Sequence, residues 1–173
     1  QEIRHALNKG PVRSFLLDLV TTDEFITATS DSVSDVRMSA RECALRFCAF
    51  YLTNWKDYKN NDLDGFLNAA MKRINEMSDD ARDELKSAFK RSMNASHMVL
   101  GDEAFRKRYR PDASKSPISK ALFETWSVAL SRLDEQQVNL LAEDGPAIHQ
   151  KFMSTLKEDR EFEVSISYAT GVP

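Results

Sequence analysis

Residues 37–53 read RMSARECALRFCAFYLT, and this stretch decides the fold class. On a helical wheel of about 100° per residue, its apolar and small side chains cover most of the circumference. A helix that is apolar nearly all round is normally buried inside a larger structure. We therefore expect a buried central helix over about residues 38–53, with one narrow polar seam formed by Glu42, Arg46 and Thr53.

Amphipathic helical patterns surround this central stretch. The clearest one follows it, with apolar residues three and four apart on one face: Leu63, Phe66, Leu67, Ala70, Met71, Ile74 and Met77. The chain of 173 residues contains five Gly and five Pro, which argues against a turn-rich all-β fold. The sequence predicts a mainly α fold, an irregular multi-helix bundle of about seven to nine helices around the central helix, in a single domain over residues 1–173.

Local signals predict where two of the helices begin. Ser39 and Glu42 have the spacing of a capping box, which places the start of the central helix at Ala40. Ser116 followed by Pro117 predicts an N-cap and a first helical residue.

The N-terminal segment, residues 1–8, predicts a short helix with Ile3, Ala6 and Leu7 on one side. The chain opens with Gln1 rather than Met, directly in helix-like sequence. We therefore expect it to be the C-terminal fragment of a larger protein, with a processed natural N-terminus as the alternative.

Two further segments interrupt the helical patterns. Trp55 and Tyr58, just after the central helix, are expected to cover the core. The tail, residues 160–173, is expected to be extended or irregular rather than helical, because its apolar residues alternate as in a strand: Phe162, Val164, Ile166 and Tyr168.

Composition limits the cellular setting. The net charge of −3 is too small to predict a nucleic-acid partner for the whole surface. No apolar run approaches the roughly 18 residues of a membrane span, so no membrane association is expected. The two cysteines, Cys43 and Cys48, would point in different directions from the central helix and cannot readily form a disulfide. A reducing, cytoplasmic location fits best.

Glu42 and Arg46 are separated by one helical turn in the otherwise apolar central helix. On a solvent-facing seam they would form a surface ion pair worth a few tenths of a kcal/mol. Facing another helix or domain, they would form a buried pair whose one-sided removal costs roughly 3–5 kcal/mol. A ligand-contacting role is the third alternative.

The single basic cluster is Arg106, Lys107, Arg108, Tyr109 and Arg110. Its cations are candidates for phosphate contacts, and its tyrosine is a candidate for stacking on a base. A solvated loop beside a helix end is the commoner explanation of such a short cluster.

Catalytic and metal-binding patterns are missing from the sequence. His5, His97 and His149 are far apart, none lies at ligand spacing from a cysteine or another histidine, and each is expected to be an ordinary surface or hydrogen-bonded side chain. The sequence contains no glycine-rich phosphate loop and no Gly-x-Ser-x-Gly motif. We therefore predict no catalytic residue, metal or cofactor for this chain.

Several short signatures, in order along nearly the whole chain, carry a family resemblance: QEIRHALNKGP at 1–11, R-M-x-x-x-E-x-x-L-R-F at 37–47, LDGFLNAAM at 63–71, LGDEAFRK at 100–107, SKALFE at 119–124 and SISYATG at 165–171. With them the chain resembles the domain of unknown function 262 family, the GmrSD-like restriction and phage-defence proteins. The resemblance covers the helical C-terminal part of that domain.

This resemblance implies a neighbouring domain that the chain does not contain. The N-terminal half in the family is similar to ParB and sulfiredoxin folds, carries an Asp-Gly-Gln-Gln-Arg motif and is linked to nucleotide hydrolysis or nuclease activity. The nearest text here, residues 134–138, reads DEQQV and lacks the glycine and the arginine.

We thus expect a non-catalytic helical segment that packs on such an N-terminal domain and acts with DNA in restriction or phage defence, so that a full-length parent would be the NTPase or nuclease. The alternatives are a stand-alone helical nucleic-acid-binding module, acting through residues 106–110, and a protein-interaction scaffold.

Overall fold

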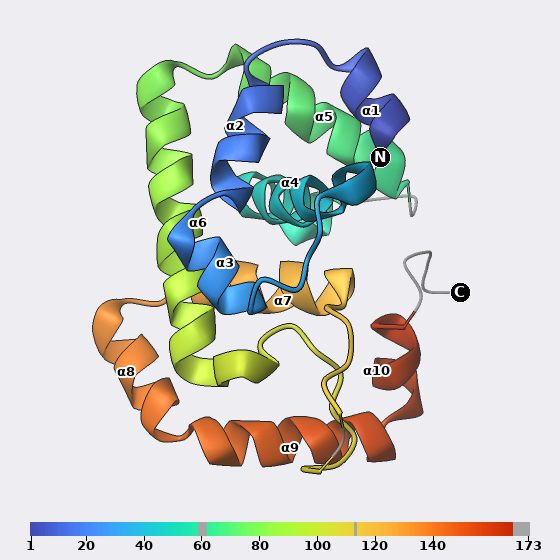
Figure 1. Cartoon of the computed structure of the whole chain (residues 1–173), viewed down its shortest axis with the longest axis vertical. Helices are drawn as coiled ribbons and strands as arrows, with labels where there is room; N and C mark the ends of the chain where they lie inside the picture. Colours follow the sequence, from blue (N-terminus) through green and yellow to red (C-terminus); the bar gives the residue numbers. More distant parts are fainter. Residues whose placement is uncertain (59–61, 113, 168–173) are drawn as a thin grey trace.

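The computed structural model describes residues 1–58, 62–112 and 114–167. These residues form ten α-helices and three short 3-10 helices, with no strand among them, which confirms the mainly α prediction (Figure 1). The α-helices are α1 Glu2–Leu7, α2 Val12–Val20, α3 Asp23–Thr29, α4 Ser39–Leu52, α5 Leu63–Glu76, α6 Asp79–Leu100, α7 Lys120–Leu130, α8 Glu135–Glu143, α9 Gly145–Glu158 and α10 Arg160–Ser165. The 3-10 helices are η1 Val36–Met38, η2 Trp55–Asp57 and η3 Gly101–Glu103.

The central helix of the sequence prediction is α4, which crosses the middle of the molecule (Figure 1). It packs against α2, α5 and α7, so that other helices cover most of its circumference. Its buried apolar and small residues are Ala40, Cys43, Ala44, Leu45, Phe47, Cys48 and Ala49. The nearly continuous apolar surface of this stretch therefore has a physical reason, because most of the helix surface meets a neighbour.

A chain of aromatic contacts carries the core from α4 to the loop after η3. Phe47 of α4 meets Phe89 of α6 edge to face, with ring centroids 5.2 Å apart. Phe89 stacks with Phe25 of α3, and Phe25 meets Phe123 of α7 edge to face. Phe123 then contacts Phe105, with ring centroids 4.5 Å apart. Rings at these separations attract one another beyond their burial, so this chain ties four helices and one loop together.

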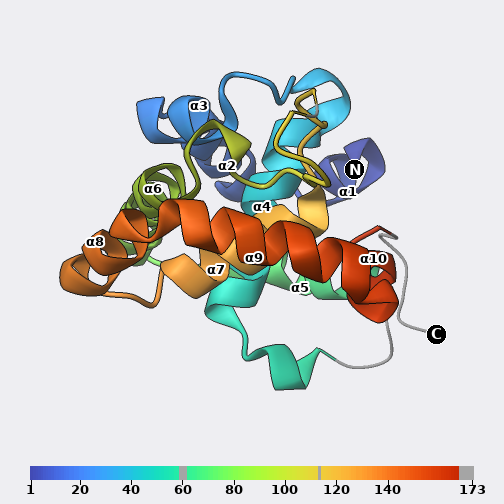
Figure 2. The same cartoon turned by 90° about the horizontal axis from the view of Figure 1, so that it is seen from below.

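The C-terminal helices form a smaller second core against α7. Helix α9 runs across the molecule below α7 in Figure 1, and it crosses in front of α7 in the view from below (Figure 2). Its buried members are Leu156 of α9, Leu122 of α7 and Ile166, with Phe152 and Phe162 packed beside them.

The expectation of an extended tail is wrong for the described part, because residues 160–165 form α10. The Asp159 carboxylate accepts a hydrogen bond from the N–H of Phe162 at 2.9 Å, which caps the helix start. Phe162 faces Phe152 edge to face, and Phe162 and Ile166, which are four residues apart and share one helical side, both pack in the second core. Tyr168 lies outside the described residues.

The two aromatic residues after α4 behave differently. Tyr58 packs edge to face on Phe50 and Phe66, with centroids 5.8 and 5.1 Å away, and covers that part of the core as expected. Trp55 in η2 is 69% exposed, so the expectation that it covers the core is wrong. Lys56 Nζ lies over its indole ring, 5.6 Å from the centroid.

Helix α7 begins three residues later than its sequence signal predicts. Ser119 is the N-cap, and its hydroxyl accepts the N–H of Leu122. The preceding residue, Ile118, forms an isolated antiparallel bridge with Arg106, and the Ser119 N–H donates to the carbonyl of Phe105 at 2.9 Å. This long-range pairing holds residues 116–118 extended, which explains why Pro117 does not start the helix.

Candidate functional site

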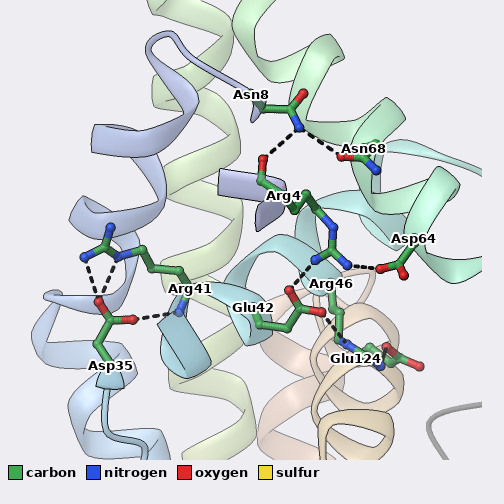
Figure 3. A network of polar contacts seen from close by, with 9 residues as sticks. All are labelled: Arg4, Asn8, Asp35, Arg41, Glu42, Arg46, Asp64, Asn68 and Glu124. Atoms are coloured by element: carbon green, nitrogen blue, oxygen red, sulfur yellow. Dashed lines mark hydrogen bonds and ion pairs between the residues drawn. The ribbon is translucent and has the colours of Figure 1, made fainter. Parts of the chain in front are cut away.

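The polar seam of α4 faces other helices rather than solvent. Glu42 is 3% exposed and Arg46 is 5% exposed. Arg4 from α1 donates to Glu42 Oε2 and to Asp64 of α5, and Figure 3 shows its guanidinium between these two carboxylates. Arg46 donates from Nη1 to Glu124 Oε2 of α7 at 2.9 Å, and its Nε lies 3.7 Å from Glu42 Oε1. A line of alternating charges therefore joins α1, α4, α5 and α7.

The prediction of a Ser39–Glu42 capping box is wrong. Helix α4 begins at Ser39, one residue before the predicted start. Its N-cap is Met38, which has a left-handed backbone conformation and makes no capping hydrogen bond through its side chain. Asp35 instead accepts the Arg41 N–H at 3.3 Å and the Arg41 Nε–H at 2.8 Å. The carboxylate of Glu42 is thereby left for the two arginines, and a charged pairing in the interior outweighs a local cap.

Helix α1 is amphipathic, but its polar side faces the interior and its apolar side faces outward. Its polar residues Arg4 and His5 and the C-cap residue Asn8 are buried, while Ile3 and Leu7 are each 76% exposed. Asn8 donates from Nδ2 to Asn68 Oδ1 of α5 at 2.9 Å, which adds a second polar link beneath the helix. The apolar side of this helix was correctly grouped from the sequence, but it points away from the core.

His5 departs from the expectation of an ordinary or hydrogen-bonded histidine. Its side chain is fully buried, and neither ring nitrogen has a hydrogen-bond partner among the described residues. Burial lowers the pKa of His5 below its ordinary value, and Arg41, Arg4 and Arg13 lower it further, whereas Glu42 opposes them. The imidazole of His5 is therefore neutral at pH 7 in the folded protein.

Of the other two histidines, His149 bonds the carbonyl of Leu100 through Nε2 at 3.1 Å. His97, at the end of α6, has a buried Nδ1 without a hydrogen-bond partner among the residues described.

The remaining titratable groups near the seam are also tuned by burial. Desolvation raises the pKa of Glu124, and the neighbouring Arg46 opposes that rise. Burial raises the pKa of the Cys43 thiol to about 12, and it raises the pKa of Cys48 as well. Both cysteines therefore stay protonated at neutral pH and do not supply a thiolate nucleophile.

Arg106, the first cation of the basic cluster, has a structural role, because it cross-links segments of the backbone. It is 5% exposed, and its guanidinium donates to the backbone carbonyls of Thr29, Asp102 and Ser116 and to the hydroxyl of Ser32. These acceptors come from the end of α3 and the loop after it, from η3 and from the segment before α7. A phosphate contact through this cluster would have to rest on its other members.

The other members of the basic cluster differ in availability. Lys107 donates to the hydroxyl of Ser167 at 2.6 Å, and the Tyr109 hydroxyl bonds Glu163 at 3.3 Å. Arg108 forms an ion pair with Glu103. Arg110 is exposed, and its Nε lies 3.9 Å from Asp112. Burial and the carboxylate of Glu163 raise the pKa of Tyr109, so this phenol is uncharged at neutral pH.

The seam and the basic cluster meet at one cavity of about 520 Å³. Arg46 lines it from α4, Lys107 and Tyr109 line it from the loop, and Lys120 lines it from the first turn of α7. Sequence reasoning named three of these four residues but not their association. It missed Lys120, for which the only available signal was its place at the start of a helix.

A second cavity of about 670 Å³ lies between α7, α9 and α10 and is mostly apolar, with Trp126, Ile148, Phe152 and Phe162 in its walls. Within residues 1–58, 62–112 and 114–167, no group of three or more His, Cys, Asp and Glu side chains is placed to hold a metal ion. No described helix has the length and apolar character needed to cross a membrane.

In comparisons with known proteins, no family model, no curated protein and no solved structure matches the chain.

Proposed function

We propose that this chain is a non-catalytic helical segment that packs, through the exposed side of α1, on an N-terminal ParB- or sulfiredoxin-like domain of the same protein. The proposal joins the resemblance to the domain of unknown function 262 family with one structural observation, the reversed amphipathicity of α1. The whole protein would hydrolyse nucleotides or cleave DNA in restriction or phage defence. The cytoplasm is the corresponding location.

The support from α1 is energetic. Ile3 and Leu7 lie one turn apart and are each 76% exposed. Burying an aliphatic side chain of this size stabilises an interface by about 1.5–3 kcal/mol. The buried Arg4 beneath them bonds Glu42 and Asp64, so the helix presents its apolar side from a fixed position. A preformed surface loses less conformational entropy when a neighbour packs on it.

The test is made on the longest natural form of the protein that contains this segment. Ile3→Asp with Leu7→Asp should weaken the packing of the two parts, and limited proteolysis should then cut between them faster. Nucleotide hydrolysis or DNA cleavage by the longer protein should fall with it. The matched control is Leu140→Asp in α8, which replaces another exposed leucine far from α1 in the sequence.

Within residues 1–173 alone, the double substitution at α1 should change the free energy of unfolding by less than about 0.5 kcal/mol, because both side chains are exposed. Equal sensitivity of the longer protein to the control and to the α1 variant would contradict the proposal. An upstream coding sequence without an Asp-Gly-Gln-Gln-Arg motif would contradict the family part of it.

A further inference from the structure

The cavity between the basic loop, α7 and α10 has an unusual balance of charge. The charged side chains that line it are Arg46, Lys107 and Lys120, and no carboxylate is among its described lining residues. The chain as a whole has more acidic than basic side chains, 27 against 24. Arg46 is paired with Glu42 and Glu124, so the positive potential of the cavity comes from the two lysines, and it favours an anion.

Arg46 lines the interior side of this cavity. A guanidinium carries five N–H donors, and among the described residues that of Arg46 makes one hydrogen bond, from Nη1 to Glu124. Its Nε is buried without a hydrogen-bond partner. Arg46 also forms ion pairs with Glu42 and Glu124, so its charge is compensated, and it offers the interior side of the cavity N–H donors rather than net charge.

The two lysines provide the charge that no carboxylate of the described residues compensates. Lys107 and Lys120 are half-buried, and neither has a carboxylate within ion-pair distance in the described parts of the chain. Lys107 donates to the hydroxyl of Ser167, which leaves two further ammonium protons. Charge-assisted hydrogen bonds from such groups to phosphate oxygens are short and strong.

The start of α7 adds neutral donors to the same cavity. Ser119, Lys120 and Ala121 all line it, and they are the N-cap and the first two residues of an 11-residue helix. The first N–H groups of a helix have no intrahelical acceptor, and the helix dipole favours negative charge at this end. The hydroxyls of Ser116 and Ser167 also border the cavity.

We propose that this cavity binds a phosphate group. Its two lysines, its hydroxyls and the N–H groups at the start of α7 suit a phosphate carrying close to two negative charges. Its volume of about 520 Å³ and the apolar walls of Ile118 and Ile166 leave room for a group attached to the phosphate. The phosphate could be free, part of a mononucleotide or the 5′ end of a DNA strand. This inference is independent of the proposed packing through α1.

Binding is measured on the chain itself by isothermal titration calorimetry at low ionic strength. The ligands are inorganic phosphate, AMP, and one single-stranded oligonucleotide with and without a 5′ phosphate. At least one phosphate ligand should bind saturably and raise the midpoint of thermal unfolding. Lys107→Gln and Lys120→Gln should each weaken that binding by about tenfold or more, since each removes a charge-assisted hydrogen bond.

The matched control is Arg110→Gln, which removes a cation from the same loop that does not line the cavity. It should leave the affinity within about twofold. Helix content by circular dichroism shows that all three variants fold. The tightest phosphate ligand identifies the source, and a preference for the 5′-phosphorylated over the unphosphorylated oligonucleotide identifies a nucleic-acid end.

Two results would overturn the site. One is the lack of saturable binding by every phosphate ligand up to about 10 mM, well above the millimolar range of weak but specific sites. The other is equal loss of affinity in Arg110→Gln and in the lysine variants, because general attraction by the loop would then explain the binding.

Discussion

The interior seam and the basic loop both contain arginines, and they use them in different ways. Arg4 and Arg46 lie between helices and are neutralised by carboxylates from α4, α5 and α7. Arg106 is as deeply buried, but its partners are backbone carbonyls and a hydroxyl. Arg110, four residues further along the chain, is exposed. Neighbouring charges in the sequence therefore have unrelated roles, and the acceptors around each one decide what it does.

The two regions also predict different costs of disruption. An ion pair in the interior leaves a buried charge when one partner is removed. Removal of Arg106, which bonds carbonyls, leaves neutral acceptors, and water can reach some of them when the loops move. The seam should thus be the more sensitive region.

The largest effect is expected for Glu42→Gln. The substitution preserves the shape of the side chain but leaves Arg4 and Arg46 with one carboxylate fewer between them. The free energy of unfolding, measured by urea denaturation, should fall by about 3–5 kcal/mol. The control is Asp64→Asn, which removes the exposed partner of the same Arg4 and should cost less than about 1 kcal/mol.

Equal losses for Glu42→Gln and Asp64→Asn would show that burial does not set the strength of this network. The claim that buried ion pairs of the seam contribute more to stability than exposed ones would then be wrong.

An intermediate effect is expected for Arg106→Gln. The shorter amide cannot reach all of the carbonyls that the guanidinium bonds, so the loops after α3 and η3 lose their link. The free energy of unfolding should fall by about 2–3 kcal/mol. Arg110→Gln in the same loop should stay within about 0.5 kcal/mol of the parent chain. If Arg106→Gln lowered the free energy of unfolding no more than Arg110→Gln does, the basic loop would be uniformly solvated.

The smallest effect is a pH dependence from His5. Its pKa is lowered in the folded state, so between 6.5 and that lower value the unfolded chain binds more protons than the folded one. Stability should therefore decrease as the pH falls through this window, by at most about 1.4 kcal/mol per pH unit for one proton. Glu124 acts in the opposite direction because its pKa is raised.

The measurement is urea denaturation at several pH values, for the parent chain and for His5→Phe. The phenylalanine variant removes the imidazole and should lose this part of the pH dependence, whatever its stability at pH 7. Parallel stability curves for the two proteins between pH 5 and 7 would contradict the burial of a neutral histidine.

Much of the fold could be predicted from the sequence because it depends on local periodicity. The all-round apolar pattern of α4 and the stripe of α5 follow directly from the spacing of their residues. The start of α7 and the helical tail could not be predicted in this way. The first is set by the pairing of Ile118 with Arg106, and the second by the packing of Phe162 on Phe152.

The candidate site was predictable only in its parts. Glu42 and Arg46 stand out because charges are rare in an apolar helix, and residues 106–110 stand out as a short run of cations. Their meeting at one cavity with Lys120 depends on the packing of α4, α7 and the loop. No local pattern carries that information, because the residues lie up to 74 positions apart, from 46 to 120.

The sequence by itself determined the fold class, the identity of the central helix and the residues that form its polar seam. Those features depend on which side chains recur at helical spacing, and a helix is a local structure. Only the tertiary structure decided which charges are buried, paired or free, because that depends on which helices meet. It placed Arg4 and His5 inside and Ile3 and Leu7 outside, the reverse of what an isolated amphipathic helix would predict.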